Sequence, residues 1–122
     1  MSASVSMPST LDETTINLVA ADTRFEGTLI LDAISRINGV LVGKVLAKDG
    51  STLILSETSV VEGEILADTL FIDGFVRGKI YAKTRIVISR TGRVIGEVQT
   101  PSLIIEPGAF IEGQCKMEKL IT

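Results

Sequence analysis

The side chains that could carry out chemistry in this chain are few, and no group of them has the makeup of an active site. The 122 residues include no histidine, which is the commonest general base and metal ligand near neutral pH. The single cysteine, Cys115, lies among alternating apolar residues, so we interpret it as a small buried hydrophobe rather than a reactive thiol. Four glutamates lie on predicted strands that also carry Lys or Arg, which favours a solvated charge ladder over an acid–base pair: Glu62, Glu64, Glu97 and Glu112. We therefore predict no enzyme activity and assign no catalytic, cofactor-binding or metal-binding residue.

Charge and composition exclude several further classes of ligand. No GxxxxGK[ST] motif occurs, so no nucleotide is expected as a cofactor. The 12 basic and 15 acidic residues are well mixed and form no basic stripe, so nucleic acid is not an expected partner. A lone cysteine suits a reducing cytoplasm, and the N-terminus lacks the basic and apolar regions of a secretion signal. No apolar run approaches the roughly 20 residues of a spanning helix. We expect a soluble cytoplasmic protein.

A repeated pattern determines the predicted fold. The order apolar, any residue, glycine, any residue, apolar occurs six times at a period near 17 residues, around Gly27, Gly43, Gly63, Gly78, Gly96 and Gly113. Second apolar strands follow at 53–55, 70–72, 86–88 and 103–105. This period is too short for repeats of paired helices, but it suits one coil of a β-solenoid with about three short strands. The expected class is all-β, a parallel β-helix of about six short coils.

Alternation along the strands assigns an inward and an outward side. Two apolar columns point inward: Phe25, Leu41, Val61, Val76, Val94 and Ile111, and Leu29, Val45, Ile65, Ile80, Val98 and Cys115. The glycine between them should also point inward, because a Cβ would crowd the narrow core. The outward neighbours Lys44, Glu64, Lys79 and Glu97 alternate in sign. Opposite charges on paired strands contribute roughly 0.2–1 kcal/mol each, so this order supports the predicted register.

The main rival fold is a left-handed hexapeptide β-helix of the kind found in acyltransferases. Such proteins repeat an aliphatic residue and glycine three times per coil, whereas here glycine is phased once per coil. Their usual catalytic base is a histidine, which this chain lacks. A hexapeptide-type acyltransferase is therefore the less favoured alternative.

The second strand of the coil is apolar on its outward side as well. Its outward middle positions form a lateral stripe of Ile54, Phe71, Val87 and Ile104. A strand buried on one face should alternate, so this lateral stripe requires a cover. The cover could be the N-terminal segment, a neighbouring filament, a membrane or a protein partner.

The two ends of the solenoid are the expected polymerisation interface. Terminal coils expose unpaired strand edges, which usually carry caps. The apolar residues assigned to this interface are Ile16, Leu18, Phe25, Leu103, Ile105, Phe110 and Ile111. Phe110 is notable because the same outward column otherwise reads Arg24, Val40, Val60, Phe75 and Arg93. It could fold over the end as a plug; our preferred hypothesis is that it joins one subunit to the next.

The segment Thr23-Arg24-Phe25-Glu26-Gly27-Thr28-Leu29, with the later Gly-Lys-Val/Ile and Ile/Val-Gly-Glu-Val copies, resembles the bactofilin family over about residues 14–117. The resemblance implies a right-handed β-helix that assembles head to head and tail to tail into non-polar filaments without a nucleotide. It implies a cytoplasmic scaffold, often at the inner membrane face, that recruits cell-wall enzymes or polarity proteins to set cell shape or position. A non-filamentous adaptor, which binds protein partners through the lateral stripe, remains an alternative.

The family resemblance also defines the expected domain organisation. It implies a disordered N-terminal tail at 1–13, a β-helical domain at 14–117 and a short C-terminal tail at 118–122. The N-terminal tail often attaches to the membrane in this family, and the residues here that could do so are Met1, Val5, Met7 and Leu11. No Lys or Arg accompanies them, so attraction to anionic lipids would be weak for one copy.

Overall fold

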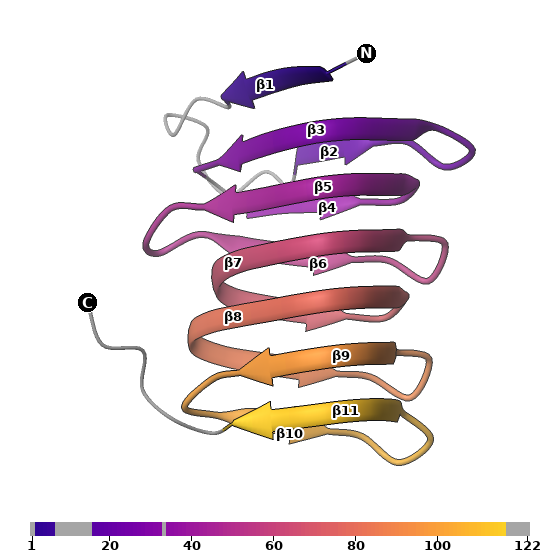
Figure 1. Cartoon of the computed structure of the whole chain (residues 1–122), viewed down its shortest axis with the longest axis vertical. Coiled ribbons are helices and arrows are strands. Elements are labelled where there is room, and N and C mark those ends of the chain that lie inside the picture. The colour runs from indigo at the N-terminus through magenta and orange to yellow at the C-terminus, as the bar shows by residue number, and fades with distance from the viewer. Residues whose placement is uncertain (1, 7–15, 33, 117–122) are drawn as a thin grey trace.

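A computed structural model describes residues 2–6, 16–32 and 34–116 of the chain. These residues form eleven β-strands in one parallel sheet that winds around itself (Figure 1). The strands are β1 (Ser2–Ser6), β2 (Ile16–Val19), β3 (Arg24–Leu31), β4 (Ile34–Ile37), β5 (Val40–Ala47), β6 (Thr52–Leu55), β7 (Val60–Ile72), β8 (Phe75–Ile88), β9 (Arg93–Gln99), β10 (Leu103–Ile105) and β11 (Phe110–Lys116). In the described part of the chain, no helix is long and apolar enough to cross a membrane.

The strands form two stacks on opposite sides of the solenoid. The first stack contains β1, β3, β5, the first part of β7, the first part of β8, β9 and β11. The second stack contains β2, β4, β6, the remainder of β7, the remainder of β8 and β10. As the chain descends in Figure 1, front strands run right to left and rear strands left to right, which makes the coil right-handed. The predicted parallel β-helix is confirmed.

Each coil has two strands rather than the expected three. From β3 to β11 the first stack makes five steps, so the described solenoid has about five turns, close to the predicted number of about six coils. β7 and β8 turn the corner between the two stacks without a break, and in the other coils the described residues at this corner form no third strand. The register between them shifts at the corner, between Ala67 and Thr69. A bulge of this kind lets a strand bend sharply while it continues to pair on both sides.

The core consists of the predicted inward columns of the first stack together with inward residues of the second stack, such as Leu53 and Ile72. Their members in the middle coils, among them Leu41, Val61 and Ile80, have no exposed surface. The paired residues are the ones expected from the alternation, for example Val45 with Ile65 and Ile65 with Ile80. Aliphatic side chains of this size each contribute about 1.5–3 kcal/mol when fully buried. The stacked columns therefore supply the main stabilisation of the fold.

The reason for the phased glycines is different from the one we expected. Gly63 stacks between Gly43 and Gly78, and each of these residues has φ between 134° and 139°. A Cβ on Gly63 would lie 1.9 Å from the carbonyl oxygen of Gly43 in the preceding coil. The constraint is thus a left-handed backbone with close contact between coils, and not crowding of side chains in the core.

The N-terminal segment also differs from the expectation of a disordered tail. Residues 2–6 form β1, which pairs in parallel with β3 from Ser2 opposite Glu26 to Ser6 opposite Ile30. Figure 1 shows β1 above β3, at the N-terminal end of the first stack. The unpaired edge of β3 offers a row of backbone donors and acceptors, which explains why a short segment adds to it. The other residues of the predicted tails, 1, 7–13 and 118–122, lie outside the described residues.

A carboxylate holds the corner between the stacks. Asp68 accepts a hydrogen bond of 2.6 Å from the backbone N–H of Gly50 and another from the hydroxyl of Thr84. These two hydrogen bonds, the larger effect coming from Thr84, lower the pKa of Asp68 below its usual value. Nearby, Lys83 forms an ion pair of 2.8 Å with Asp49. Side chains from three successive coils are thereby connected at one corner.

The lowered pKa of Asp68 predicts a loss of stability in acid. A carboxyl group whose pKa is lower in the folded protein stabilises the fold above its unfolded pKa, and this contribution disappears as the pH falls through the folded pKa. Because the group is close to solvent, we expect the contribution to be below about 1 kcal/mol. Urea unfolding of Asp68→Asn and of the unmodified chain should differ at pH 7 and converge near pH 2. Glu57→Gln, in an exposed turn, is the control; a difference for Asp68→Asn that does not change with pH would contradict the assignment.

Candidate assembly surfaces

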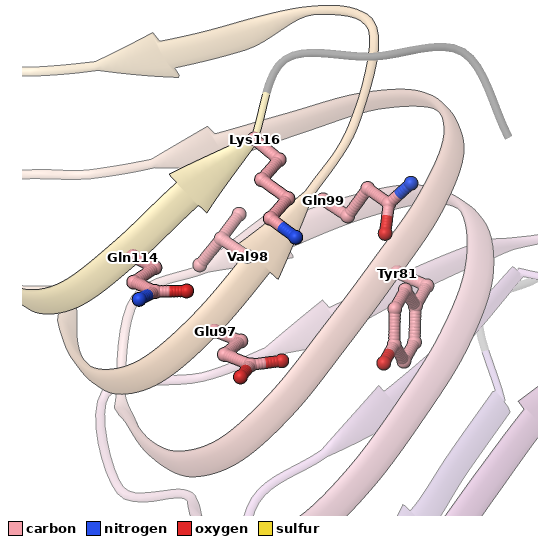
Figure 2. A pocket seen from close by; sticks show the side chains of 6 residues that line it. All are labelled: Tyr81, Glu97, Val98, Gln99, Gln114 and Lys116. Atoms are coloured by element: carbon pink, nitrogen blue, oxygen red, sulfur yellow. The ribbon is translucent and has the colours of Figure 1, made fainter.

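The described residues include a small cleft and no candidate metal site. No group of three or more His, Cys, Asp or Glu side chains within residues 2–6, 16–32 and 34–116 is arranged to hold a metal ion. The small cleft lies across the neighbouring strands β8, β9 and β11 and is lined by Tyr81, Glu97, Val98, Gln99, Gln114 and Lys116 (Figure 2). Its lining includes no serine, threonine, cysteine or histidine. The residues that the sequence singled out lie elsewhere, on the side surfaces and at the ends of the solenoid.

Cys115 is exposed, so the prediction of a buried residue is wrong. Its register is nevertheless the predicted one, because it pairs with Val98, which is 1% exposed. The difference arises from position along the axis: Val98 is covered by β11, whereas β11 is the last described strand of its stack. Cys115 thus marks the end of the inward column.

The C-terminal coil presents an apolar surface. Ile105 stacks on the fully buried Ile88, yet Ile105 itself is 49% exposed. Beside it, Ile104 is 44% exposed, and Leu103 and Ile111 are partly buried. Ile105 is exposed because the core continues up to this coil and no further described coil covers it; Ile104 is an outward residue that likewise lacks a stacked neighbour on one side. Four of the residues assigned to the polymerisation interface therefore lie together at this end: Leu103, Ile105, Phe110 and Ile111.

Phe110 lies at the rim of the same coil. It pairs with Arg93, which in turn pairs with Phe75, so Phe110 is the last member of the predicted outward column. Its side chain is 46% exposed. A plug folded over the end would be expected to bury most of its ring, so this exposure favours a residue available for contact with another molecule.

The N-terminal end has a different arrangement from the predicted one. Phe25 is half-buried on β3, but β3 is not the terminal strand because β1 pairs with its outer edge. Ile16 and Leu18 lie on β2, the outermost strand of the second stack, and their side chains are outside the described residues. The predicted interface residues at this end are therefore divided between a covered strand and an uncovered one.

The predicted lateral stripe is a continuous column. Ile54 pairs with Phe71, Phe71 with Val87 and Val87 with Ile104. Ile54, Phe71 and Val87 are only partly exposed, because stacked neighbours at strand spacing cover one another. Residues 2–6 pair with β3 of the other stack and not with the strands of this column. Of the possible membrane-attaching residues, Val5 lies on β1 opposite Leu29, and Met1, Met7 and Leu11 lie outside the described residues.

Sequence reasoning missed a second outward apolar column, on the first stack. Ile30, Leu46, Leu66 and Tyr81 pair with one another in successive strands. Leu46 is 38% exposed and Leu66 is 37% exposed. The signal was present in the sequence, since these residues occupy the position between two inward residues of each copy, where a polar residue is expected.

The alternating charge column has the predicted register. Lys44 pairs with Glu64, Glu64 with Lys79 and Lys79 with Glu97. The Nζ atom of Lys44 lies 3.9 Å from Oε2 of Glu64. At the first coil, Arg24 and Glu26 form an ion pair of 2.9 Å, and this hydrogen bond lowers the pKa of Glu26. One outward column of the first stack is therefore an ordered array of charges, beside the outward apolar column.

These features define a class of protein: a short parallel β-solenoid with an apolar terminal coil and no evident reactive site in its described part. Residues 17–116 match the family model of bactofilins, described as polymer-forming cytoskeletal proteins. Because this match covers most of the chain, the protein belongs to the bactofilin family. The family prediction is confirmed, and the match favours a bactofilin over the hexapeptide-type alternative.

Two curated relatives from Myxococcus xanthus are similar to the chain. Bactofilin BacO is 30% identical over 82 residues, which are 67% of this chain and 64% of BacO. Bactofilin BacP is 32% identical over 66 residues, which are 54% of this chain and 28% of BacP. The chain thus spans less than two thirds of the length of each relative. No solved structure gives a significant match.

Proposed function

We propose that this protein is a cytoskeletal scaffold that assembles end to end into non-polar filaments without a nucleotide, and that it is not an enzyme. The observation that carries the proposal is the C-terminal coil, where Ile105 and Phe110 are each about half exposed although they continue columns of the solenoid. Membership of a polymer-forming family supports the same function.

End-to-end assembly would remove this apolar surface from water. In a tail-to-tail contact, the C-terminal coil of one subunit meets that of another, and the contact is isologous because both sides use the same residues. Burial of apolar surface contributes about 25 cal/mol per Å², and such a contact also hides the unpaired edges of β10 and β11. The N-terminal ends would meet in the same way, which makes the filament non-polar.

High-speed sedimentation over a concentration series tests the proposal. In nucleotide-free buffer, the pelleted fraction should rise steeply above a threshold concentration, and ATP or GTP should leave it unchanged. The alternative function, an adaptor that binds protein through the lateral stripe, predicts a species of fixed size at all concentrations. A requirement for nucleotide, or a fixed small oligomer, would refute the filament.

We further propose that the filament is cytoplasmic and peripheral to the inner face of the membrane, and organises cell shape or positions cell-wall or polarity proteins. The proposal rests on the family resemblance and on avidity, because many weak tails on one filament can bind together what a single tail cannot. Flotation with phospholipid vesicles tests the membrane part. Filaments should float, whereas Phe110→Arg subunits should remain at the bottom; filaments that stay at the bottom would refute membrane attachment.

A further inference from the structure

The first stack carries an outward column of charges that is complementary to its own reverse. In chain order the column reads Thr28, Lys44, Glu64, Lys79, Glu97 and Gln114, one residue from each of β3, β5, β7, β8, β9 and β11. The four charged side chains are exposed. Read from the other end, every lysine takes the place of a glutamate and every glutamate that of a lysine.

This order matters when the same face of a second copy is turned by a two-fold axis that runs along the strands between β7 and β8. The axis places β5 opposite β9 of the second copy and β7 opposite β8. Lys44 then faces Glu97 of the second copy, and Glu64 faces Lys79. The two-fold axis repeats each of these two contacts, so all four charge contacts are attractive. The interface is isologous, so the two copies form a closed dimer.

The parallel arrangement, with each strand opposite its own copy, gives the contrary result. Lys44 would face Lys44, Glu64 would face Glu64, and the other two charges would likewise meet their own kind. Like charges that face each other repel, so they disfavour the parallel arrangement of the two copies. This column thus favours antiparallel over parallel pairing; the adjacent outward column adds an attractive contact between Glu62 and Arg77 at the centre and places Glu26 opposite Glu112 at the ends.

The neighbouring column supplies an apolar centre for the same contact. Leu66 on β7 would face Tyr81 on β8 of the second copy, and Leu46 on β5 would face Gln99 on β9. Leu46 and Leu66 are among the few large apolar side chains that the described residues expose. Figure 2 shows Tyr81 and Glu97 lining one cleft, so the two columns share one side of the solenoid. Apolar centres beside complementary charges are characteristic of specific protein interfaces.

We propose that this chain pairs laterally with a second copy of itself, antiparallel, through the outward face of the first stack. The charged and apolar contacts come from the middle strands β5, β7, β8 and β9, so lateral pairing does not require end-to-end assembly. In a filament it would join two filaments side by side, because every subunit carries the same face.

Single charge reversals and their mixture test the pairing. Lys44→Glu and Glu97→Lys each create two repulsive contacts in the antiparallel dimer, and we expect the Kd for dimerisation to rise about tenfold or more in each. An equimolar mixture of the two variants should restore dimers, because each altered residue then faces an opposite charge. Within one chain, residues 44 and 97 are three strands apart, so mixing cannot repair any contact inside a subunit.

Sedimentation velocity is the measurement, made on the unmodified chain or, if that chain forms long polymers, on Ile105→Arg, a change at the exposed end of the second stack and away from this face. Far-UV circular dichroism checks that each variant is folded; Lys44→Gln and Glu97→Gln, which remove a charge without reversing it, replace any variant that is not. A monomeric parent, single variants that dimerise like the parent, or a mixture of reversals that stays monomeric would each overturn the proposal. None of these outcomes depends on whether the ends polymerise.

Thiol crosslinking tests the orientation. With Cys115→Ser as background, Leu46→Cys and Gln99→Cys lie three strand spacings apart in one chain, roughly 14 Å, which is too far for a short internal crosslink. Antiparallel pairing places the two positions on facing sheets, whose backbones lie about 10 Å apart with the side chains between them, so a short thiol-to-thiol crosslinker of about 5 Å should give a covalent dimer of the double variant. Leu46→Cys alone should not crosslink. A covalent dimer from Leu46→Cys alone, or none from the double variant, would overturn the antiparallel arrangement.

Discussion

Gly63→Ala is expected to destabilise the solenoid by about 4 kcal/mol or more, a large part of the roughly 5–15 kcal/mol that stabilises a domain. The added Cβ would lie 1.9 Å from the carbonyl oxygen of Gly43, and the backbone at Gly63 has φ of 134°. Neither strain can relax locally, because Gly63 is paired with a glycine on both sides. Urea unfolding followed by circular dichroism measures the loss.

Gly50→Ala is the matched control for this prediction. Gly50 also has a positive φ, of 83°, but no atom lies within 4 Å of the position of its Cβ. The cost should be limited to backbone strain, about 1–2 kcal/mol. Equal losses of stability at Gly50 and Gly63 would show that backbone conformation alone explains the glycines, and that close stacking of the coils does not.

Phe110→Arg is expected to abolish end-to-end assembly while the subunit stays folded. Phe110 is 46% exposed at the rim of the last described coil, so its replacement should change subunit stability by no more than about 0.5 kcal/mol. In a tail-to-tail contact the new charge would be taken from water into an apolar surface, without a partner, at a cost of several kcal/mol. Sedimentation should show loss of the pelleted fraction, with an unchanged circular dichroism spectrum and melting temperature.

Phe75→Arg is the matched control that distinguishes an effect at the end of the solenoid from an effect on its side surface. Phe75 occupies the same outward column as Phe110, and the intervening residue in that column is Arg93. The same substitution is thus made in an equivalent local setting, in the middle of the chain. Filaments should persist in Phe75→Arg; their loss in both variants would mean that Phe110 has no special role at the end.

The register of the solenoid could be predicted because two sequence signals agree. The phased glycines give the coil length, and the alternation of residues such as Val61, Glu64 and Ile65 assigns each side chain to the core or to solvent. Stacking then follows from translation alone, since each coil repeats the one before it. For this reason the charge pairing of Lys44 with Glu64 was predictable to the residue.

Features that depend on the ends of the chain could not be predicted in the same way. Cys115 has the pattern of a core residue, but its exposure depends on the coil that follows it and not on its own strand. Pairing of Ser2–Ser6 with β3 lacks a pattern signal, because it rests on backbone hydrogen bonds that nearly any residue can form. The glycine column was located correctly but for the wrong reason, since φ and the distance between coils are three-dimensional quantities.

Negative-stain electron microscopy of the purified protein in nucleotide-free buffer, beside Phe110→Arg, tests the central claim most directly. We predict long filaments in the unmodified protein and dispersed, folded subunits in the variant. Monodisperse monomers or closed small oligomers in the unmodified protein would contradict end-to-end assembly through the exposed terminal coil.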